Sequence, residues 1–515
     1  MPQGDRVAND PTSSSTPESP GVTSLAGEVI SGTRWTGLSQ VAMQGTRLIV
    51  QVILARLLAP EDFGAIAVAL VVVHLLDIVM DLGTGPAIIQ RRELAPSLAS
   101  AIFVLNAVLG AILCLTLILT ADFVAGLFGT PDARPVLQVM AFALIITSLA
   151  RTQQAMLRRN LKFRAVAMVG IGGSLASAFV AIPAALLGAG VWALVAGHLA
   201  MATAMAVIAY RSSGWLPSRP FDFRGLREIA DYSLNVSGTQ FIEFFLQSAD
   251  KVVIGRFLGV VPLGVYAIAE RFMRYPVYAL ARVLMGVLFP TLSRTQEDPA
   301  ALRRAVLRSG GAMALIVLPM MVGLASIAEE FTHVVLGDRW SEVVPLLQIL
   351  APAGAIQALV MGCSTVFLAT GRADLQFRLG LLTGIAYLVS YLVGVQWGLP
   401  GLAIAFGVAV VVMAVPGLIL PLRLIDLRLR DFLRELRPYV FSTAIMSLAV
   451  IMMSRVLSEI GGSSLVVLVS GVATGVVVYG GAILLLRPPA LGDVLALTGL
   501  QHKLSFLVKP PRKVV

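Results

Sequence analysis

The sequence predicts an all-α polytopic membrane protein with about 14 transmembrane helices, in which two parallel six-helix repeats form N and C lobes, followed by two extra C-terminal helices. Three observations lead to this prediction: the composition, the spacing of the apolar runs, and an internal repeat. Of the 515 residues 57% are hydrophobic and only 13% are charged, and the mean hydropathy is +0.86. These values lie outside the range of soluble globular proteins and leave little sequence for a soluble domain.

Apolar runs separated by short polar breaks fill nearly the whole chain, and each is long enough to cross a bilayer as a helix. The shortest breaks, around Gly188 and Gly398, follow the fifth and eleventh runs. The runs fall at 34–58, 63–90, 98–120, 134–155, 165–187, 190–210, 229–256, 262–291, 308–328, 343–369, 376–396, 399–422, 438–456 and 463–486.

Cationic residues alternate between the connections. The even-numbered connections carry clusters such as Arg158, Arg159, Lys162 and Arg164, whereas the odd-numbered ones carry about one cation or none. By the positive-inside rule the even-numbered connections are cytoplasmic, which places both termini in the cytoplasm. This topology accounts for the net charge of +10, so a nucleic-acid partner is not expected.

An internal repeat relates the two halves. Residues 53–69 (ILARLLAPEDFGAIAVA) align without a gap to 253–269 (VIGRFLGVVPLGVYAIA), at an offset of 200 residues. Two further matches, at an offset of 210, join 135–141 to 345–351 and 186–197 to 396–407. An even number of spans separates equivalent positions, so the halves are parallel repeats, which is the architecture of a transporter that works by alternating access.

The repeat also pairs individual residues whose roles are expected to be structural. Arg56 and Arg256 each close a helix at the predicted periplasmic boundary, where an arginine can reach the interface and interact with the helix C-terminus. Gly64 and Gly264 are expected to be turn or close-packing positions.

The predicted domain boundaries follow from these runs. The N-terminal segment is rich in Pro, Ser, Thr and acidic residues and lacks the apolar core of a signal peptide. The predicted parts are a disordered cytoplasmic tail (1–33), the N lobe (34–210), a cytoplasmic linker (211–228), the C lobe (229–422), an amphipathic cytoplasmic helix (423–437), the last two spans (438–486) and a basic cytoplasmic tail (487–515).

Several motifs carry a family resemblance. The run DKVVIGRFLGVVPLGVYAIAERFMRYP, followed by VLFPTLSR, together with ARLLAPEDFGAIAVAL and DLGTGPAIIQRR, resembles the polysaccharide transporter family of Wzx-type oligosaccharide flippases. This family belongs to the multidrug/oligosaccharidyl-lipid/polysaccharide exporter superfamily. The resemblance extends from about residue 34 to about residue 489.

This resemblance implies a carrier of the bacterial inner membrane, and not an enzyme. It would move a polyprenyl-diphosphate-linked oligosaccharide, with undecaprenyl diphosphate as the expected carrier lipid, from the cytoplasmic to the periplasmic leaflet. The product would feed the synthesis of O-antigen lipopolysaccharide, capsule or exopolysaccharide. The implied partners are this lipid-linked oligosaccharide and the bilayer, with a polysaccharide polymerase and glycosyltransferases as candidate protein partners. No cofactor is expected, and four scattered histidines indicate no metal cluster.

Polar side chains recur at helical spacing on equivalent helices of the two lobes. A charged side chain at the centre of a bilayer costs at least about 2.5–3.5 kcal/mol unless it faces a polar interior, so the four helices are expected to wall one cavity. The first and seventh runs carry Gln40, Gln44, Arg47 and Gln51, and Gln240, Glu243, Gln247, Asp250 and Lys251. The second and eighth runs carry His74, Asp77 and Asp81, and Arg271, Arg274, Tyr278 and Arg282.

The residue types suit a diphosphate-linked sugar. Arginine matches phosphate oxygens with a planar fork, lysine acts as a compact charge, and amides can both donate to and accept from sugar hydroxyls. The hypothesis assigns the diphosphate to Arg47, Lys251, Arg271 and Arg274 and the glycan to Gln40, Gln44, Gln240 and Gln247. The acids that are candidates for coupling to a proton or sodium gradient are Asp77, Asp81, Glu243, Asp250 and Glu270.

Each assignment has an alternative. Asp77 or Asp81 could neutralise Arg47, and Asp250 or Glu270 could pair with an arginine of the eighth run, as purely structural ion pairs. A multidrug extruder would share the topology, but its cavity should be rich in acids and aromatics, whereas the eighth run is basic. A membrane glycan polymerase or ligase would need a long periplasmic loop, and no odd-numbered connection exceeds about 20 residues.

Overall fold

The computed structural model describes residues 45–91, 93–274, 277 and 298–492, with the backbone alone for residues 227–239 and Pro299. Within these residues the regular structure is entirely helical. A helical stretch covers residues 45–57 and another covers 260–274. The first half continues with α2 (Pro60–Asp81), α3 (Thr84–Gln90), α4 (Pro96–Leu127), α5 (Arg134–Met140), α6 (Phe142–Arg159), α7 (Phe163–Leu186), α8 (Val191–Ser213) and α9 (Phe223–Leu258).

The second half holds α11 (Pro299–Ser326), α12 (Ala328–Phe331), the π-helical turn η2 (Thr332–Leu336), α13 (Val343–Ala369), α14 (Ala373–Gly394), α15 (Gly398–Leu424), α16 (Leu429–Glu459) and α17 (Ser464–Leu486). Ten stretches among the described residues are long and apolar enough to cross a membrane, and one of these, 373–424, contains both α14 and α15. The prediction of an all-α polytopic membrane protein is therefore confirmed. The count of 14 stays a prediction, because parts of the first and eighth runs lie outside the described residues.

The short breaks at Gly188 and Gly398 are real turns. Gly188 has φ +79° and Gly398 has φ +73°, a conformation that glycine adopts without strain. The second predicted run, in contrast, does not form one helix. It is interrupted after Asp81, where Leu82 (φ 41°) and Gly83 (φ 68°) are both left-handed, so that α3 leaves the axis of α2.

The segment predicted to be a separate amphipathic helix, 423–437, is divided differently in the structure. Its first two residues end α15, and residues from Leu429 onward form the first turns of α16, which continues through Pro438 to Glu459. The apolar face of this segment packs on the protein, because Phe432 fills the space beside Gly310 of α11. The bilayer surface is not needed to cover it.

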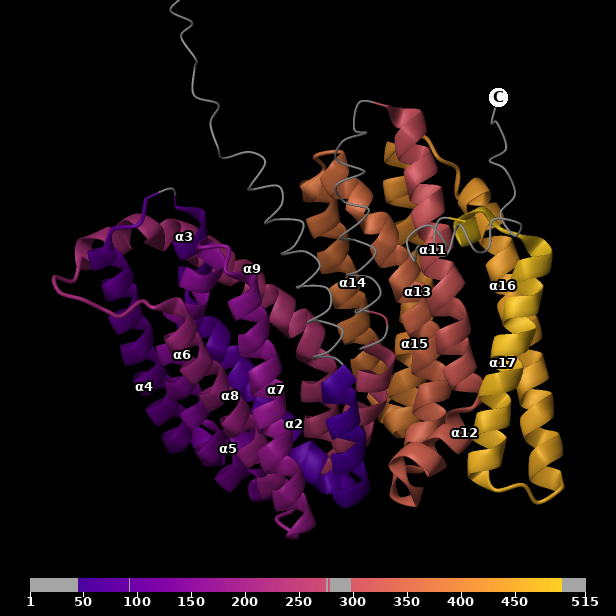
Figure 1. The fold of residues 1–515 in the computed structure, drawn as a ribbon, viewed down its shortest axis with the longest axis horizontal. Helices are drawn as coiled ribbons and strands as arrows, with labels where there is room; N and C mark the ends of the chain where they lie inside the picture. Colours follow the sequence, from indigo (N-terminus) through magenta and orange to yellow (C-terminus); the bar gives the residue numbers. More distant parts are fainter. Residues whose placement is uncertain (1–44, 92, 275–276, 278–297, 493–515) are drawn as a thin grey trace, which may run out of the picture.

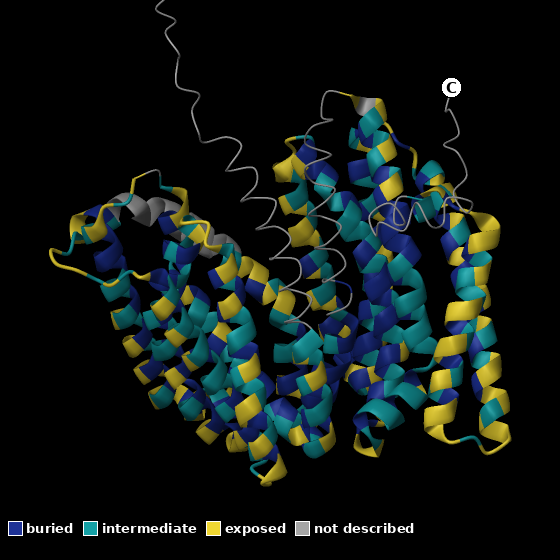
Figure 2. Cartoon of the chain, in the orientation of Figure 1, coloured by how far each residue is buried: buried dark blue, intermediate teal, exposed yellow. Residues whose placement is uncertain are grey.

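The helices form two groups that meet at one end of the molecule and diverge toward the other. One group contains α2 to α8, and the other contains α11 and α13 to α15, with the α16–α17 hairpin on its outer side (Figure 1). Helix α9 joins the groups, since it packs on both α2 and α14. Exposed residues cover the outward side of the hairpin, while buried residues concentrate where the groups converge (Figure 2).

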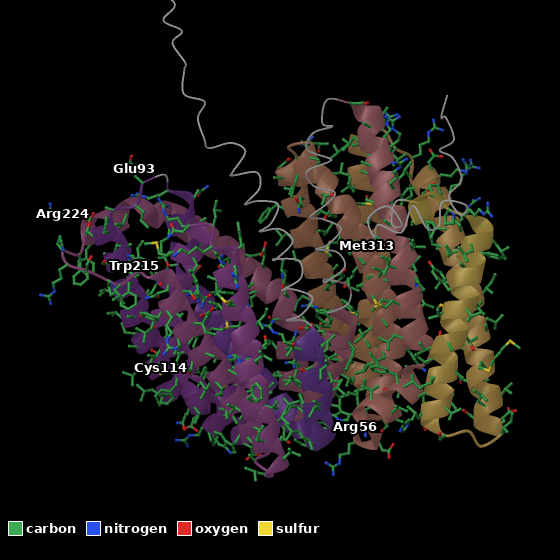
Figure 3. All side chains as sticks on the ribbon, viewed as in Figure 1. Arg56, Glu93, Cys114, Trp215, Arg224 and Met313 are labelled. Atoms are coloured by element: carbon green, nitrogen blue, oxygen red, sulfur yellow. The ribbon has the colours of Figure 1, made fainter. Side chains whose placement is uncertain are left out.

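The converging end is held by contacts that cross between the groups. Trp340, which is fully buried, donates from Nε1 to the carbonyl of Ala55 at 2.8 Å and packs edge-on against Phe63. Arg56 donates to the carbonyls of Val334 and Val335 in η2. Figure 3 places Arg56 at this end and Arg224 at the opposite one. The structural role predicted for Arg56 is confirmed, although its partners belong to the other half of the chain.

Candidate functional site

A cavity of about 490 Å³ lies between the two halves of the chain. One wall comes from α2, α6 and α8 and carries His74, Asp77, Thr147 and His198. The other comes from α9 and residues 260–274 and carries Gln247, Ser248, Lys251, Glu270, Arg271 and Arg274. The polar faces of the second, seventh and eighth runs thus meet as the sequence predicts. The lining contains none of the described residues of the first run, 45–57.

The second-half wall contains a compact ion cluster. Lys251 Nζ lies 2.8 Å from Glu270 Oε2 and 3.5 Å from Asp250 Oδ1, and Arg274 Nε lies 3.1 Å from Glu270 Oε1. The buried Asp250 also accepts from the Tyr266 hydroxyl at 2.9 Å. Because two cations here face two carboxylates, the cluster has no net formal charge. The predicted pairing of Glu270 with an arginine is confirmed for Arg274, whereas Asp250 pairs with Lys251 and Tyr266.

Arg271 differs from the other cations of this wall. It lines the cavity and donates from Nη1 to the side-chain carbonyl oxygen of the buried Gln51. It forms no salt bridge with an acid among the described residues. Its guanidinium is therefore the positive charge of this wall that no carboxylate of the described residues contacts. Its hydrogen bond to Gln51 links the eighth run to the first.

The first-half wall has an excess of negative charge. Arg151 of α6 pairs with Asp77 and, at 2.9 Å, with the buried Asp81, both on α2. Thr147 Oγ1 donates to Asp77 Oδ1 at 3.4 Å. Two carboxylates share one guanidinium, so the cluster has a formal charge of −1. The alternative that Asp77 or Asp81 neutralises Arg47 is wrong, because Arg151 occupies both carboxylates.

A second cavity of about 410 Å³ adjoins the first, since Gln247 and Arg274 line both. Its wall combines amides, hydroxyls and aromatic rings. Gln357 Nε2 donates to the Tyr387 hydroxyl at 3.3 Å, and Tyr391 stacks on Phe406 with ring centroids 5.5 Å apart. Apolar ring faces beside amide and hydroxyl groups suit a sugar, which presents both C–H faces and hydroxyls.

The remaining predicted residues lie elsewhere. Arg47 is exposed on the stretch 45–57, and neither it nor Gln240 lines the two cavities. Glu243 lines a pocket that adjoins the second cavity, since Gln247 and Gln376 line both, and none of the other four acids lines this pocket. Gln40, Gln44, Tyr278 and Arg282 fall outside the described residues. Of the four proposed diphosphate ligands the structure brings together Lys251, Arg271 and Arg274.

Three functional candidates escaped the sequence analysis. Arg151 is a cation inside the apolar run 134–155, so the energetic argument used for the eighth run applied to it equally. His198 and Gln357 lie in mostly apolar runs, without the polar side chains repeated every three or four residues that mark the first and seventh runs. They become visible only when the helices are packed together.

A family model described as "Polysaccharide biosynthesis protein" matches residues 53–345. The succinoglycan biosynthesis transport protein ExoT of Rhizobium meliloti is 31% identical over 332 residues, which are 64% of this chain and 66% of that protein. The lipopolysaccharide biosynthesis protein WzxC of Escherichia coli is 23% identical over 387 residues, 74% of this chain and 78% of that protein.

Among solved structures, the lipid II flippase MurJ in an inward closed conformation superposes with a TM-score of 0.71 at 13% identity, covering 89% of this chain and 99% of MurJ. An inward-facing multidrug transporter of the MATE family has a TM-score of 0.63 at 16% identity and covers 76% of this chain and 98% of its own. These two likenesses concern the fold.

Proposed function

The chain belongs to the polysaccharide biosynthesis protein family, and we propose that it is a flippase that moves a polyprenyl-diphosphate-linked oligosaccharide across the membrane by alternating access. One observation carries the proposal: the cavity with the cationic wall adjoins the cavity lined by amides and aromatic rings. A ligand that joins a diphosphate to a glycan has the same division between an anionic part and a hydroxyl-rich part. Relatives named for polysaccharide synthesis and transport support the same substrate class.

The diphosphate lies against Arg271, with Arg274 and Lys251 completing the cationic wall. The diphosphate contacts Arg271 first, because no carboxylate of the described residues has to be displaced from its guanidinium. Lys251 and Arg274, in contrast, both form salt bridges with Glu270. Bidentate contact with phosphate is favourable for arginine and is strengthened in a site that excludes water. The first-half wall, with its excess carboxylate, repels the anion and so confines it to the second half.

The glycan extends past Gln247 into the second cavity, where Gln357 and Tyr387 offer hydrogen bonds and Phe406 and Tyr391 offer apolar ring faces. Gln247 stands at the junction because it lines both cavities. Its amide can bond either the last phosphate oxygen or the first sugar hydroxyl.

The coupling ion, if the carrier uses one, is assigned to Asp77 and Asp81. Their cluster has one carboxylate more than cations, and Asp77 and His198 both line the cavity. Asp250 and Glu270 are matched by Lys251 and Arg274, and Glu243 does not line the first cavity. A proton or sodium ion at Asp77 would cancel the excess charge before the anionic substrate enters.

The chain is a multi-pass membrane protein, and the proposed location is the bacterial inner membrane with both termini cytoplasmic. The proposed lobes are residues 34–210 and 229–422, with the converging Arg56 end toward the periplasm. This orientation follows from the arginine-rich even-numbered connections, represented by Arg224 at the opposite end. A polysaccharide polymerase and glycosyltransferases remain candidate partners.

The proposal is tested in liposomes that contain the purified protein and a fluorescent polyprenyl-diphosphate oligosaccharide in one leaflet. Transfer to the other leaflet is followed by a glycosidase that cannot cross the bilayer. We expect transfer by the wild type, at least tenfold slower transfer by Arg271→Gln, and unchanged transfer by Arg304→Gln, an exposed arginine outside both cavities. A folded preparation that moves cationic dyes and none of this lipid would instead support the multidrug extruder.

A further inference from the structure

A third cavity, of about 790 Å³, lies on the far side of the second half, between the α16–α17 hairpin and helices α11, α12 and α13. It shares no lining residue with the two cavities of the proposed transport site. It is found at the same end of the molecule as α12 and the connection between α16 and α17 (Figure 1). Its volume is within the range of ligand-binding sites in proteins.

At the end of the hairpin away from this cavity, α16 packs tightly on the second half. The cavity is therefore confined to one end of the hairpin. Phe432 and Tyr439 lie in close contact with Gly310 and Gly311 of α11. Farther along α16, Ser326 and Ser447 are joined by a hydrogen bond of 2.7 Å and form the inner end of the cavity. Beyond them the helix face that lines the cavity is polar, with Ser454, Arg455, Ser458 and Glu459 at helical spacing.

Charged groups of both signs line this cavity without a salt bridge. Glu329 and Glu330 of α12 and Arg455 and Glu459 of α16 all line it, and none of the four forms an ion pair within the described part of the chain. Arg455 and Glu459 do not pair with each other, although they are one helical turn apart. Glu329, Arg455 and Glu459 are exposed at the end of the molecule, so their charges are accessible to a ligand.

A buried hydroxyl gives a second, independent indication of a ligand. Ser454 is 7% exposed, lines the cavity, and its Oγ has no hydrogen-bond partner. Buried polar groups in proteins are paired in the great majority of cases. A ligand that accepts or donates at this position would satisfy the serine.

The lining selects the chemistry of the ligand. The lining contains three carboxylates and one guanidinium. The carboxylates disfavour an anion and the guanidinium disfavours a simple cation, so a complementary ligand carries both a negative and a positive charge. Among the described residues no Phe, Tyr or Trp lines the cavity, so a quaternary ammonium would lack the ring faces that usually bind it. A primary ammonium, in contrast, can donate three hydrogen bonds to carboxylates and hydroxyls.

We propose that this cavity binds the headgroup of an aminophospholipid, in which a phosphate and a primary ammonium are joined by a short linker. The phosphate pairs with Arg455, and the ammonium lies between Glu329 and Glu459 with Ser454 as a further partner. The acyl chains follow the outward face of α17, which exposes apolar side chains such as Leu465, Val469 and Val472 near the cavity. The bound lipid fills the wedge between the hairpin and the second half and holds them together.

The test uses the full-length protein purified in detergent and stripped of lipid. Dioleoyl phosphatidylethanolamine, phosphatidylcholine and phosphatidylglycerol are titrated separately while the thermal unfolding temperature is recorded, and bound lipid is counted by native mass spectrometry. We expect one phosphatidylethanolamine bound per chain and a rise in Tm that the other two lipids do not reproduce. Arg455→Gln and Glu459→Gln should each weaken its binding at least tenfold.

Arg437→Gln, an exposed arginine on the same helix but outside the cavity, should bind the lipid like the wild type. Glycerophosphoethanolamine, which has the headgroup and no acyl chains, separates a lipid from a soluble ligand and should bind at least tenfold more weakly. Equal stabilisation by phosphatidylcholine, or unchanged binding in both cavity variants, would overturn the site. Equal affinity for the soluble headgroup would overturn the assignment to a membrane lipid.

Discussion

Gly64 and Gly264, which occupy equivalent positions in the internal repeat, meet where α2 crosses the helical residues 260–274. A Cβ added to Gly264 would lie 2.9 Å from the backbone nitrogen of Gly64, and a Cβ added to Gly64 would overlap the carbonyl of Val260. The two halves of the chain therefore approach backbone to backbone at this crossing. The prediction that these glycines are close-packing positions is confirmed.

Gly64→Ala and Gly264→Ala should each destabilise the protein, because the added methyl meets main-chain atoms that cannot rotate away. Overpacking of this kind costs about 1–3 kcal/mol. Thermal unfolding in detergent measures the effect. Gly362→Ala provides the matched control, since nothing lies within 4 Å of a Cβ at that helical glycine. Equal stability of all three variants would show that the crossing is looser than described.

Trp340 should contribute strongly to the stability of the same converging end. Replacing this fully buried side chain in Trp340→Ala should cost about 3–5 kcal/mol, whereas Trp340→Phe should cost about 0.5–1.5 kcal/mol for the lost hydrogen bond to Ala55. Denaturant unfolding in detergent compares them with Trp397→Ala, a tryptophan that is 68% exposed. A loss in Trp397→Ala as large as in Trp340→Ala would contradict the prediction.

Arg151 is expected to be needed for folding stability. Arg151→Leu leaves Asp77 and the buried Asp81 without their cation, and removing one partner of a buried ion pair costs about 3–5 kcal/mol. The combined variant Arg151→Leu, Asp77→Asn, Asp81→Asn should recover most of the lost stability, because it also removes the uncompensated charges. If Arg151→Leu alone unfolds at the wild-type temperature, the triad has no structural role.

Asp77 is expected to link transport to an ion gradient, provided that the proposed flippase activity holds. In liposomes, an imposed pH or sodium gradient should accelerate lipid transfer by the wild type and leave transfer by Asp77→Asn unchanged. Glu243→Gln is the control, because Glu243 does not line the cavity that contains Asp77, so this variant should keep the response of the wild type. A response lost in Glu243→Gln and kept in Asp77→Asn would move the coupling site to α9.

Much of the fold could be predicted because hydrophobic length, positive charge and the repeat are local properties of the sequence. The polar stripes on α2, α9 and 260–274 also followed from helical spacing. Helical spacing does not predict which neighbouring helix a polar face contacts. Asp77 and Asp81 pair with Arg151 because α6 packs beside α2, and the packing of these helices is decided by the whole core.

Arg47 illustrates the same limit within a single helix. It shares a face with Gln51, and the sequence therefore placed both in the cavity. Gln51 is buried and receives a hydrogen bond from Arg271, whereas Arg47 lies one turn, about 6 Å, farther from the converging end. At that height the two groups of helices have diverged, and the arginine is exposed.

The central claim is that the cationic wall of the second half holds a diphosphate, and Arg271 tests it most directly. The affinities of polyprenyl diphosphate and polyprenyl monophosphate are measured by microscale thermophoresis for the wild type, Arg271→Gln and the control Arg304→Gln. The diphosphate should bind the wild type and the control at least tenfold more tightly than the monophosphate, and Arg271→Gln should abolish that preference. Equal affinities for both lipids in the wild type, or an unchanged preference in Arg271→Gln, would contradict the account.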